Sequence, residues 1–234
     1  MNPLLDFSGL PRFDLFRVEH VTPAVDRLLA ENRALIQKIG AYPAPPAWEN
    51  FVKPLEDANE RLGRAWGLVS HLNAVMNSPE LRKVYNANLP RVTQYHAELA
   101  QDLALYRKLK ELRASPRFER LASPQKKIID NELRDFRLGG ADLPQEKKTR
   151  FLEIQEQLAA LTSRFSDNLL DATNDFALYI EDPKELTGLP QDALEAAREA
   201  AAKNDRPGWK FTLHAPSYLP VMQYADRRGL REKM

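Results

Sequence analysis

Cysteine is absent from the 234 residues of this chain. That absence excludes disulfide bonds, thiolate nucleophiles, cysteine-ligated zinc and iron–sulfur clusters. The chain also lacks an excess of either charge, because 34 lysines and arginines are balanced by 33 aspartates and glutamates. Proteins that bind nucleic acids or membrane surfaces usually show a clear basic excess, so we expect no nucleic-acid partner and no membrane partner.

Long hydrophobic runs are missing too. The longest uninterrupted apolar stretch, 176–180, is far shorter than the roughly 20 residues that a membrane-spanning helix needs. Near the N-terminus, Asp6 and Asp14 interrupt the apolar segment that a secretory signal requires. The sequence therefore predicts a cytoplasmic location. A hydrophobic content of 43% at this length is enough for a buried core.

Known catalytic signatures do not occur in this sequence either. The four histidines are His20, His71, His96 and His214, and no two of them lie four residues apart, as the zinc motif H-E-x-x-H requires. None follows a glutamate by three residues, so the E-x-x-H motif of di-metal helical bundles is also absent. The glycines form no phosphate-binding loop motif. We therefore assign no catalytic residue and no metal ligand to this chain.

What the sequence does contain is apolar residues spaced three or four apart, the period of an amphipathic helix. Several of these stripes begin at a proline preceded by Ser or Thr, which is typical of a helix N-terminus. Thr22, Ser78 and Ser123 lie at such starts, and Pro90 should kink the helix that contains it. The pattern predicts helices over 22–40, 48–76, 78–109, 123–139 and 144–169.

Two short segments have a different character. Residues 176–180 are aromatic and β-branched, and residues 209–213 alternate apolar and polar side chains. An Ala-rich helix follows Pro190 between them. We therefore predict a mainly α fold, a multi-helix N-terminal domain with a small antiparallel β pair. The helical body would span 1–175, and 176–234 would add the β pair and further helices to one compact unit.

A final helix is predicted over 226–234, with Asp226 as its cap and Leu230 among its apolar residues. Its length of about eight residues is less than the roughly 12–15 that an isolated helix needs to be stable. We infer from this that the sequence is cut inside a helix. A naturally frayed terminus is the alternative.

Charge is distributed unevenly along the chain. Basic residues outnumber acidic ones over 105–150, and the reverse holds over 151–205. The basic part could bind phosphates of an RNA, with Tyr106 and Phe118 stacking on bases. We favour a solvated helical surface instead, because Tyr106 fits the apolar stripe of its own helix.

Three polar residues form a weak candidate for a binding site. Asn73 and Asn77 are neighbours on a helix, four residues apart and off its apolar stripe, and His71 is close to them in sequence. They could line a polar cavity and form hydrogen bonds with a peptide backbone. Ordinary solvated polar residues are the alternative.

Several longer blocks of sequence form a recognisable series along the chain. The blocks are Val18–Ala24, Trp48–Asn50, Ser70–Val75, Asn77–Arg82, Leu133–Leu138, Asp142–Pro144, Leu186–Pro190 and Pro216–Met222. They run in order along nearly the whole chain, and no block is itself a chemical motif. Together they resemble the thimet oligopeptidase family of zinc metallopeptidases.

The resemblance implies a mostly helical protein built from two halves that face a deep, narrow channel. The N-terminal half forms a wall of that channel, and the C-terminal half carries H-E-x-x-H and a further glutamate ligand. Zinc would activate water there for the hydrolysis of short peptides. This sequence departs from the family pattern because those ligands and the catalytic base are not in it.

The leading hypothesis is therefore the N-terminal channel-wall segment of a zinc oligopeptidase, without zinc or activity of its own. Its partners would be short peptides, as substrates of the parent enzyme, and its own C-terminal catalytic half. A stand-alone helical module that binds a protein or peptide is the alternative.

Overall fold

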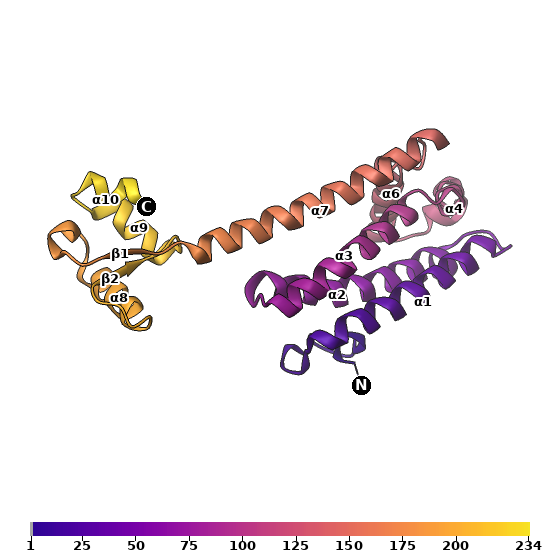
Figure 1. Cartoon of the computed structure of the whole chain (residues 1–234). Coiled ribbons are helices and arrows are strands. Elements are labelled where there is room, and N and C mark those ends of the chain that lie inside the picture. Colours follow the sequence, from indigo (N-terminus) through magenta and orange to yellow (C-terminus); the bar gives the residue numbers. More distant parts are fainter. Residues whose placement is uncertain (1) are drawn as a thin grey trace. The chain divides into compact units, whose positions relative to one another are not determined.

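The computed structural model describes residues 2–234, and most of them are helical (Figure 1). The chain divides into two compact units. The first ends at Leu161 and the second begins at Thr162. Each unit has its own buried core, and one two-stranded sheet lies in the second. The mainly α fold with a small antiparallel β pair is therefore confirmed.

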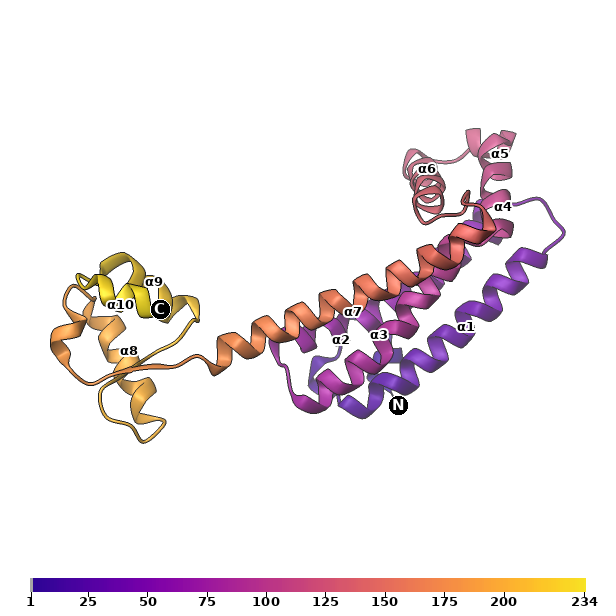
Figure 2. The same ribbon diagram turned by 45° about the horizontal axis from the view of Figure 1, so that its top comes forward.

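The first unit is built from helices that follow one another closely in sequence (Figure 2). Short helical turns at Pro3–Leu5, Phe13–Leu15 and Val18–His20 precede α1, and another at Trp48–Val52 leads into α2. The helices are α1 (Val21–Ala41), α2 (Lys53–Val75), α3 (Pro79–Ala100), α4 (Leu103–Ala114), α5 (Pro116–Glu119), α6 (Ser123–Leu138) and the first part of α7 (Gln145–Asp175).

Helix starts agree only in part with the capping residues that the sequence predicts. Ser78 caps α3, because its side chain accepts a hydrogen bond from the Leu81 backbone N–H at 3.2 Å. Thr22 does not cap α1, which begins one residue earlier. Its hydroxyl instead accepts a hydrogen bond from the Asn88 side chain at 2.9 Å, which links α1 to α3.

A single helix over 78–109 is wrong, because α3 ends at Ala100 and α4 begins at Leu103. Asp102 adopts an extended backbone between them. Its carboxylate accepts hydrogen bonds from the backbone N–H groups of Ala104 at 2.8 Å and Leu105 at 3.0 Å. This capping gives the new helix its start, and the continuous apolar spacing across the break concealed it.

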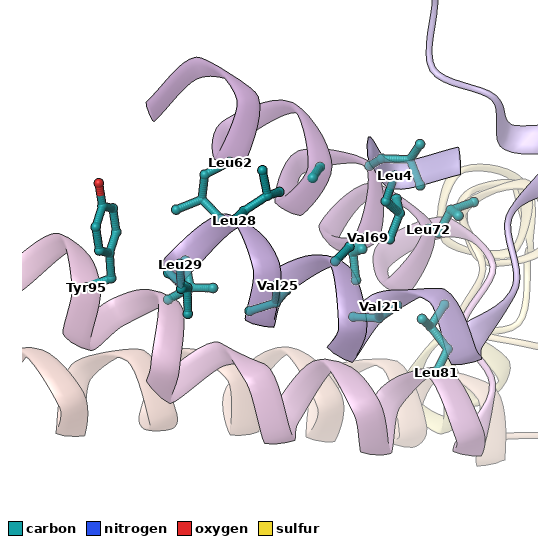
Figure 3. Packing of buried hydrophobic residues seen from close by; sticks show 14 residues of the cluster. Leu4, Val21, Val25, Leu28, Leu29, Leu62, Val69, Leu72, Leu81 and Tyr95 are labelled. Atoms are coloured by element: carbon teal, nitrogen blue, oxygen red, sulfur yellow. The ribbon is translucent and has the colours of Figure 1, made fainter. Parts of the chain in front are cut away.

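Burial of the apolar faces of α1, α2 and α3 holds the first core together (Figure 3). Val25 and Leu28 from α1 meet Leu62 and Val69 from α2, and each is at most 2% exposed. Full burial of such a side chain contributes about 1.5–3 kcal/mol. A second cluster in the same unit joins α4, α5 and α6 to the residues around the start of α2.

The second unit is organised around β1 (Leu178–Ile180) and β2 (Trp209–Phe211). The strands pair antiparallel with Leu178 opposite Phe211, as the sequence predicts. The chain runs between them through a turn at Pro183–Leu186 and helix α8 (Gln191–Ala202).

Two further helices complete the second unit, and both correct the sequence interpretation. Helix α9 (Ala215–Tyr224) was missed because it contains two prolines, one of which, Pro216, lies harmlessly in the first turn. Helix α10 (Arg228–Lys233) is capped at Arg227 rather than Asp226, whose backbone N–H donates to the Thr187 carbonyl at 2.9 Å. Leu230 is 1% exposed, so packing supplies the stability that this short helix lacks by itself.

Gly208 provides a test of the turn before β2. Its φ is +83°, and a Cβ added there would lie 2.2 Å from the Ile180 carbonyl oxygen. We expect Gly208→Ala to destabilise the second unit by about 2 kcal/mol or more, since strain and a backbone clash add. Gly63→Ala is the matched control, because that site in α2 is open, and it should stabilise the first unit by about 0.5–1 kcal/mol.

Chemical denaturation of both variants, followed by circular dichroism, gives the comparison. Equal stability of Gly208→Ala and the unaltered chain would show that this turn is not formed as described.

Candidate functional site

Helix α7 carries a row of exposed apolar side chains, which we call the α7 stripe. The exposed fractions rise from 39% at Ile154 to 70% at Phe165. The sequence pattern places these residues on the apolar side of the helix predicted over 144–169. The structure confirms the helix but leaves this side uncovered. The stripe consists of Ile154, Leu158, Leu161, Phe165 and Leu169.

The start of α7, unlike its stripe, is packed against the rest of the first unit. Lys148 is buried, and its ammonium group donates a hydrogen bond to the Gln101 carbonyl, just beyond the end of α3, at 3.4 Å. Glu156, which is exposed, lies on the side of α7 opposite the stripe because it is offset by about half a turn from Leu158 and Leu161. Both sides of this part of α7 are therefore exposed, and the stripe is the apolar one of the two.

The three predicted peptide-contacting residues lie near the end of α2 but do not act as one group. The Asn77 side-chain amide donates to the Asn73 carbonyl at 2.9 Å and to its side-chain oxygen at 3.0 Å. Arg82 donates to the Asn77 side-chain oxygen at 3.1 Å. These hydrogen bonds connect the last turn of α2 to the residues that follow it. His71 is exposed and meets the edge of Phe13, with ring centroids 5.9 Å apart. Binding of a peptide by these residues stays a prediction.

The two aromatic residues proposed for base stacking are unsuited to it. Tyr106 and Phe118 are buried, 7% and 4% exposed. Tyr106 stacks on Phe136 with centroids 5.7 Å apart, and cations cover both rings, Lys110 at 4.1 Å and Arg113 at 4.0 Å from the centroids. RNA binding through stacking on these rings is therefore disfavoured.

Two carboxyl groups of the first unit, one on α2 and one on α6, have raised pKa values. Burial is the largest cause of the raised pKa of Glu132, which together with the nearby carboxylates Glu56 and Asp135 reaches about 7, while Arg134 opposes the change. Burial also raises the pKa of Glu56. A carboxyl group with a raised pKa is a common feature of active sites, but an ion-pair network of purely structural role produces the same effect.

Over residues 2–234, no group of three or more histidines and carboxylates comes together in a way that could hold a metal ion. Within that range no helix combines the length and the apolar character needed to cross a bilayer.

A cavity of about 240 Å³ lies within the second unit, between α8, β2 and the start of α9. Alanines of α8 line it together with Phe211, Lys210 and His214. None of the residues predicted as peptide contacts lines it.

The helices of the first unit match a known protein family. Residues 25–148 match the family model of the neurolysin and thimet oligopeptidase N-terminal domain. This match covers the helices of the first unit from α1 to the start of α7. The chain belongs to this family.

Individual relatives extend the match over the whole chain. It is 46% identical over 233 residues to oligopeptidase A of Haemophilus influenzae and 43% identical over 233 residues to oligopeptidase A of Escherichia coli. A probable cytosolic oligopeptidase A of Arabidopsis thaliana is 36% identical over 240 residues. In each case 100% of this chain aligns, and it covers 34% of the relative. The chain thus spans about a third of the length of these relatives.

The raised pKa of Glu132 predicts how the stability of the first unit depends on pH. Between the unperturbed pKa of 4.5 and the folded value of about 7, the folded state binds more protons than the unfolded state. This group therefore lowers the free energy of unfolding as the pH rises through that window. Glu132→Gln should remove the effect, stabilising the chain by about 1–2 kcal/mol at pH 8 after allowance for solvent screening.

At pH 4.5 the same substitution should have almost no effect. Urea denaturation at the two pH values measures the difference, with Glu153→Gln on the exposed part of α7 as the control. A gain in stability for Glu132→Gln that is equal at both pH values would contradict the assigned pKa.

Proposed function

We propose that this chain is the N-terminal part of a zinc-dependent oligopeptidase and forms one wall of the channel in which short peptides are cut. The observation that carries the proposal is the alignment of the whole chain with the N-terminal third of oligopeptidase A from several organisms. The family match to a domain described as N-terminal supports the same assignment.

The wall acts by shape and not by bond breaking. A rigid assembly of packed helices, such as that formed by α1, α2 and α3, is suited to restricting the width of a channel. A narrow channel excludes folded proteins and admits short, extended peptides. In this proposal the substrates are short peptides, and the location is the cytoplasm. The name of the Arabidopsis relative, a probable cytosolic oligopeptidase A, supports that location.

Zinc in the complete enzyme is held outside this chain. When bound, it activates a water molecule that attacks the peptide bond. Within residues 2–234 no cluster of histidines and carboxylates suited to zinc comes together, which supports this assignment. In this proposal the catalytic and zinc-binding residues lie in the catalytic part of the parent enzyme, which is the partner of this chain.

A stand-alone binding module is the second candidate, and one observation favours it. The final helix, α10, is anchored in the second core by Leu230, as expected of a complete module. The exposed α7 stripe argues against it, because isolated soluble domains seldom leave so many large apolar side chains of one helix uncovered.

Activity measurements separate these functions. The purified 234-residue chain should retain no stoichiometric zinc and should not cleave a quenched fluorescent peptide. A hybrid, in which this chain replaces the N-terminal third of the Haemophilus influenzae relative, should do both. Hybrid cleavage should stop on chelation and should return with added zinc.

Metal-dependent cleavage by the 234-residue chain alone would contradict the proposal. So would a folded hybrid that binds zinc and cleaves no peptide, provided that the unaltered relative cleaves it under the same conditions.

Peptide contact by His71 is tested in the same hybrid. If its imidazole binds a peptide backbone, His71→Ala should raise KM about threefold, the loss expected for one hydrogen bond, and leave kcat unchanged. Lys83→Ala, an exposed site on α3, is the control. Unchanged KM in both variants, with the same melting temperature as the parent hybrid, would assign His71 to the ordinary solvated surface.

A further inference from the structure

The α7 stripe is continuous and regular. Its members lie at intervals of four, three, four and four residues, so they form one row along a helix of 31 residues. All five side chains are between 39% and 70% exposed. Phe151, half-buried, extends the row by one step toward the start of the helix.

This spacing selects the kind of element that can cover the stripe. Alternation of three- and four-residue steps from Phe151 to Phe165 follows the heptad rule, in which apolar residues repeat every 3.5 positions. Such a row packs best against another helix, crossing at about +20°, with side chains of each helix filling gaps on the other. A strand or a flat sheet face would match only isolated positions along it.

The residues that flank the stripe are of a kind that a permanent partner could cover at little cost. Residues on the neighbouring sides of the row include the uncharged Gln155, Gln157, Thr162 and Asn168, with few charges between them. A row flanked by uncharged polar groups loses little hydration when it is covered, whereas burying unpaired charges is costly.

The length of the relatives, compared with that of this chain, indicates what could cover the stripe. The chain aligns over its full extent with relatives of which it covers only 34%. In a protein of the relatives' length, the remaining two thirds would be covalently connected to this part and would meet the stripe at a high effective concentration. We propose that the α7 stripe is the docking face for one or more helices of the catalytic part that follows this chain in the complete enzyme. The inference rests on the proposed function and names the surface through which the two parts join.

Cysteine labelling tests this surface directly, because the chain contains no cysteine that would react in the background. Leu161→Cys and Phe165→Cys place a thiol on the stripe, and Glu156→Cys places one on the opposite side as the matched control. Each is made in the 234-residue chain and in the hybrid with the Haemophilus influenzae relative. A hybrid without an introduced cysteine corrects for thiols of the relative.

We expect Leu161→Cys and Phe165→Cys to react quickly with a maleimide in the 234-residue chain and more slowly in the hybrid, by about tenfold or more. Glu156→Cys should react at similar rates in both. Equal reaction of the stripe cysteines in the two proteins would overturn the proposal. Protection already present in the 234-residue chain, growing with concentration, would overturn it too, because a second copy would then be the occupant.

Peptide cleavage by the hybrid without an introduced cysteine distinguishes a failure of the docking face from a failure of the proposed function. An active hybrid with a freely reactive stripe would refute the docking face and leave the proposed function intact. A hybrid with a protected stripe and bound zinc but no activity would refute the function and leave the docking face intact.

Discussion

The burial of apolar side chains that are spaced at helical intervals determines most of this structure. Wherever two such rows meet, a core forms, as between α1 and α2, where Val25 and Leu28 oppose Leu62 and Val69. The same rule operates in the second unit, where Leu230 holds a helix that is too short to be stable by itself. The α7 stripe obeys the rule for helix formation but not for burial, and that difference connects the fold to the proposed function.

In our proposal, the α7 stripe is the surface through which this part joins the catalytic part of the parent enzyme. A domain that forms a channel wall needs one rigid side toward the channel and another joined to the catalytic part. The first core supplies rigidity without any contribution from the stripe. Covering five large apolar side chains would contribute several kcal/mol, at about 1.5–3 kcal/mol for each side chain that becomes fully buried. Such an interface would keep the wall in place during peptide turnover.

Sequence alone predicted the elements that depend on local patterns. The β pair at 176–180 and 209–213 was found because β-branched and alternating residues stand out among helical stripes, and its core is shorter, at Leu178–Ile180 and Trp209–Phe211. The break between α3 and α4 was missed, since an aspartate cap leaves the apolar period unchanged. Helix α9 was missed because its prolines resembled breakers. The exposure of the stripe was beyond prediction, because periodicity identifies an apolar face but not its neighbour.

Hydrogen exchange of the α7 backbone amides, measured in the 234-residue chain and in the hybrid, tests the central claim most directly. Exchange reports local opening, which is frequent where a helix has few packed neighbours and rare where its face is covered. If the α7 stripe is a docking face, amides between Ile154 and Leu169 should exchange much faster than those of α1 and α2 in the chain alone. In the hybrid they should become as slow as those of α1 and α2. Unchanged fast exchange of α7 in a folded, active hybrid would contradict the account.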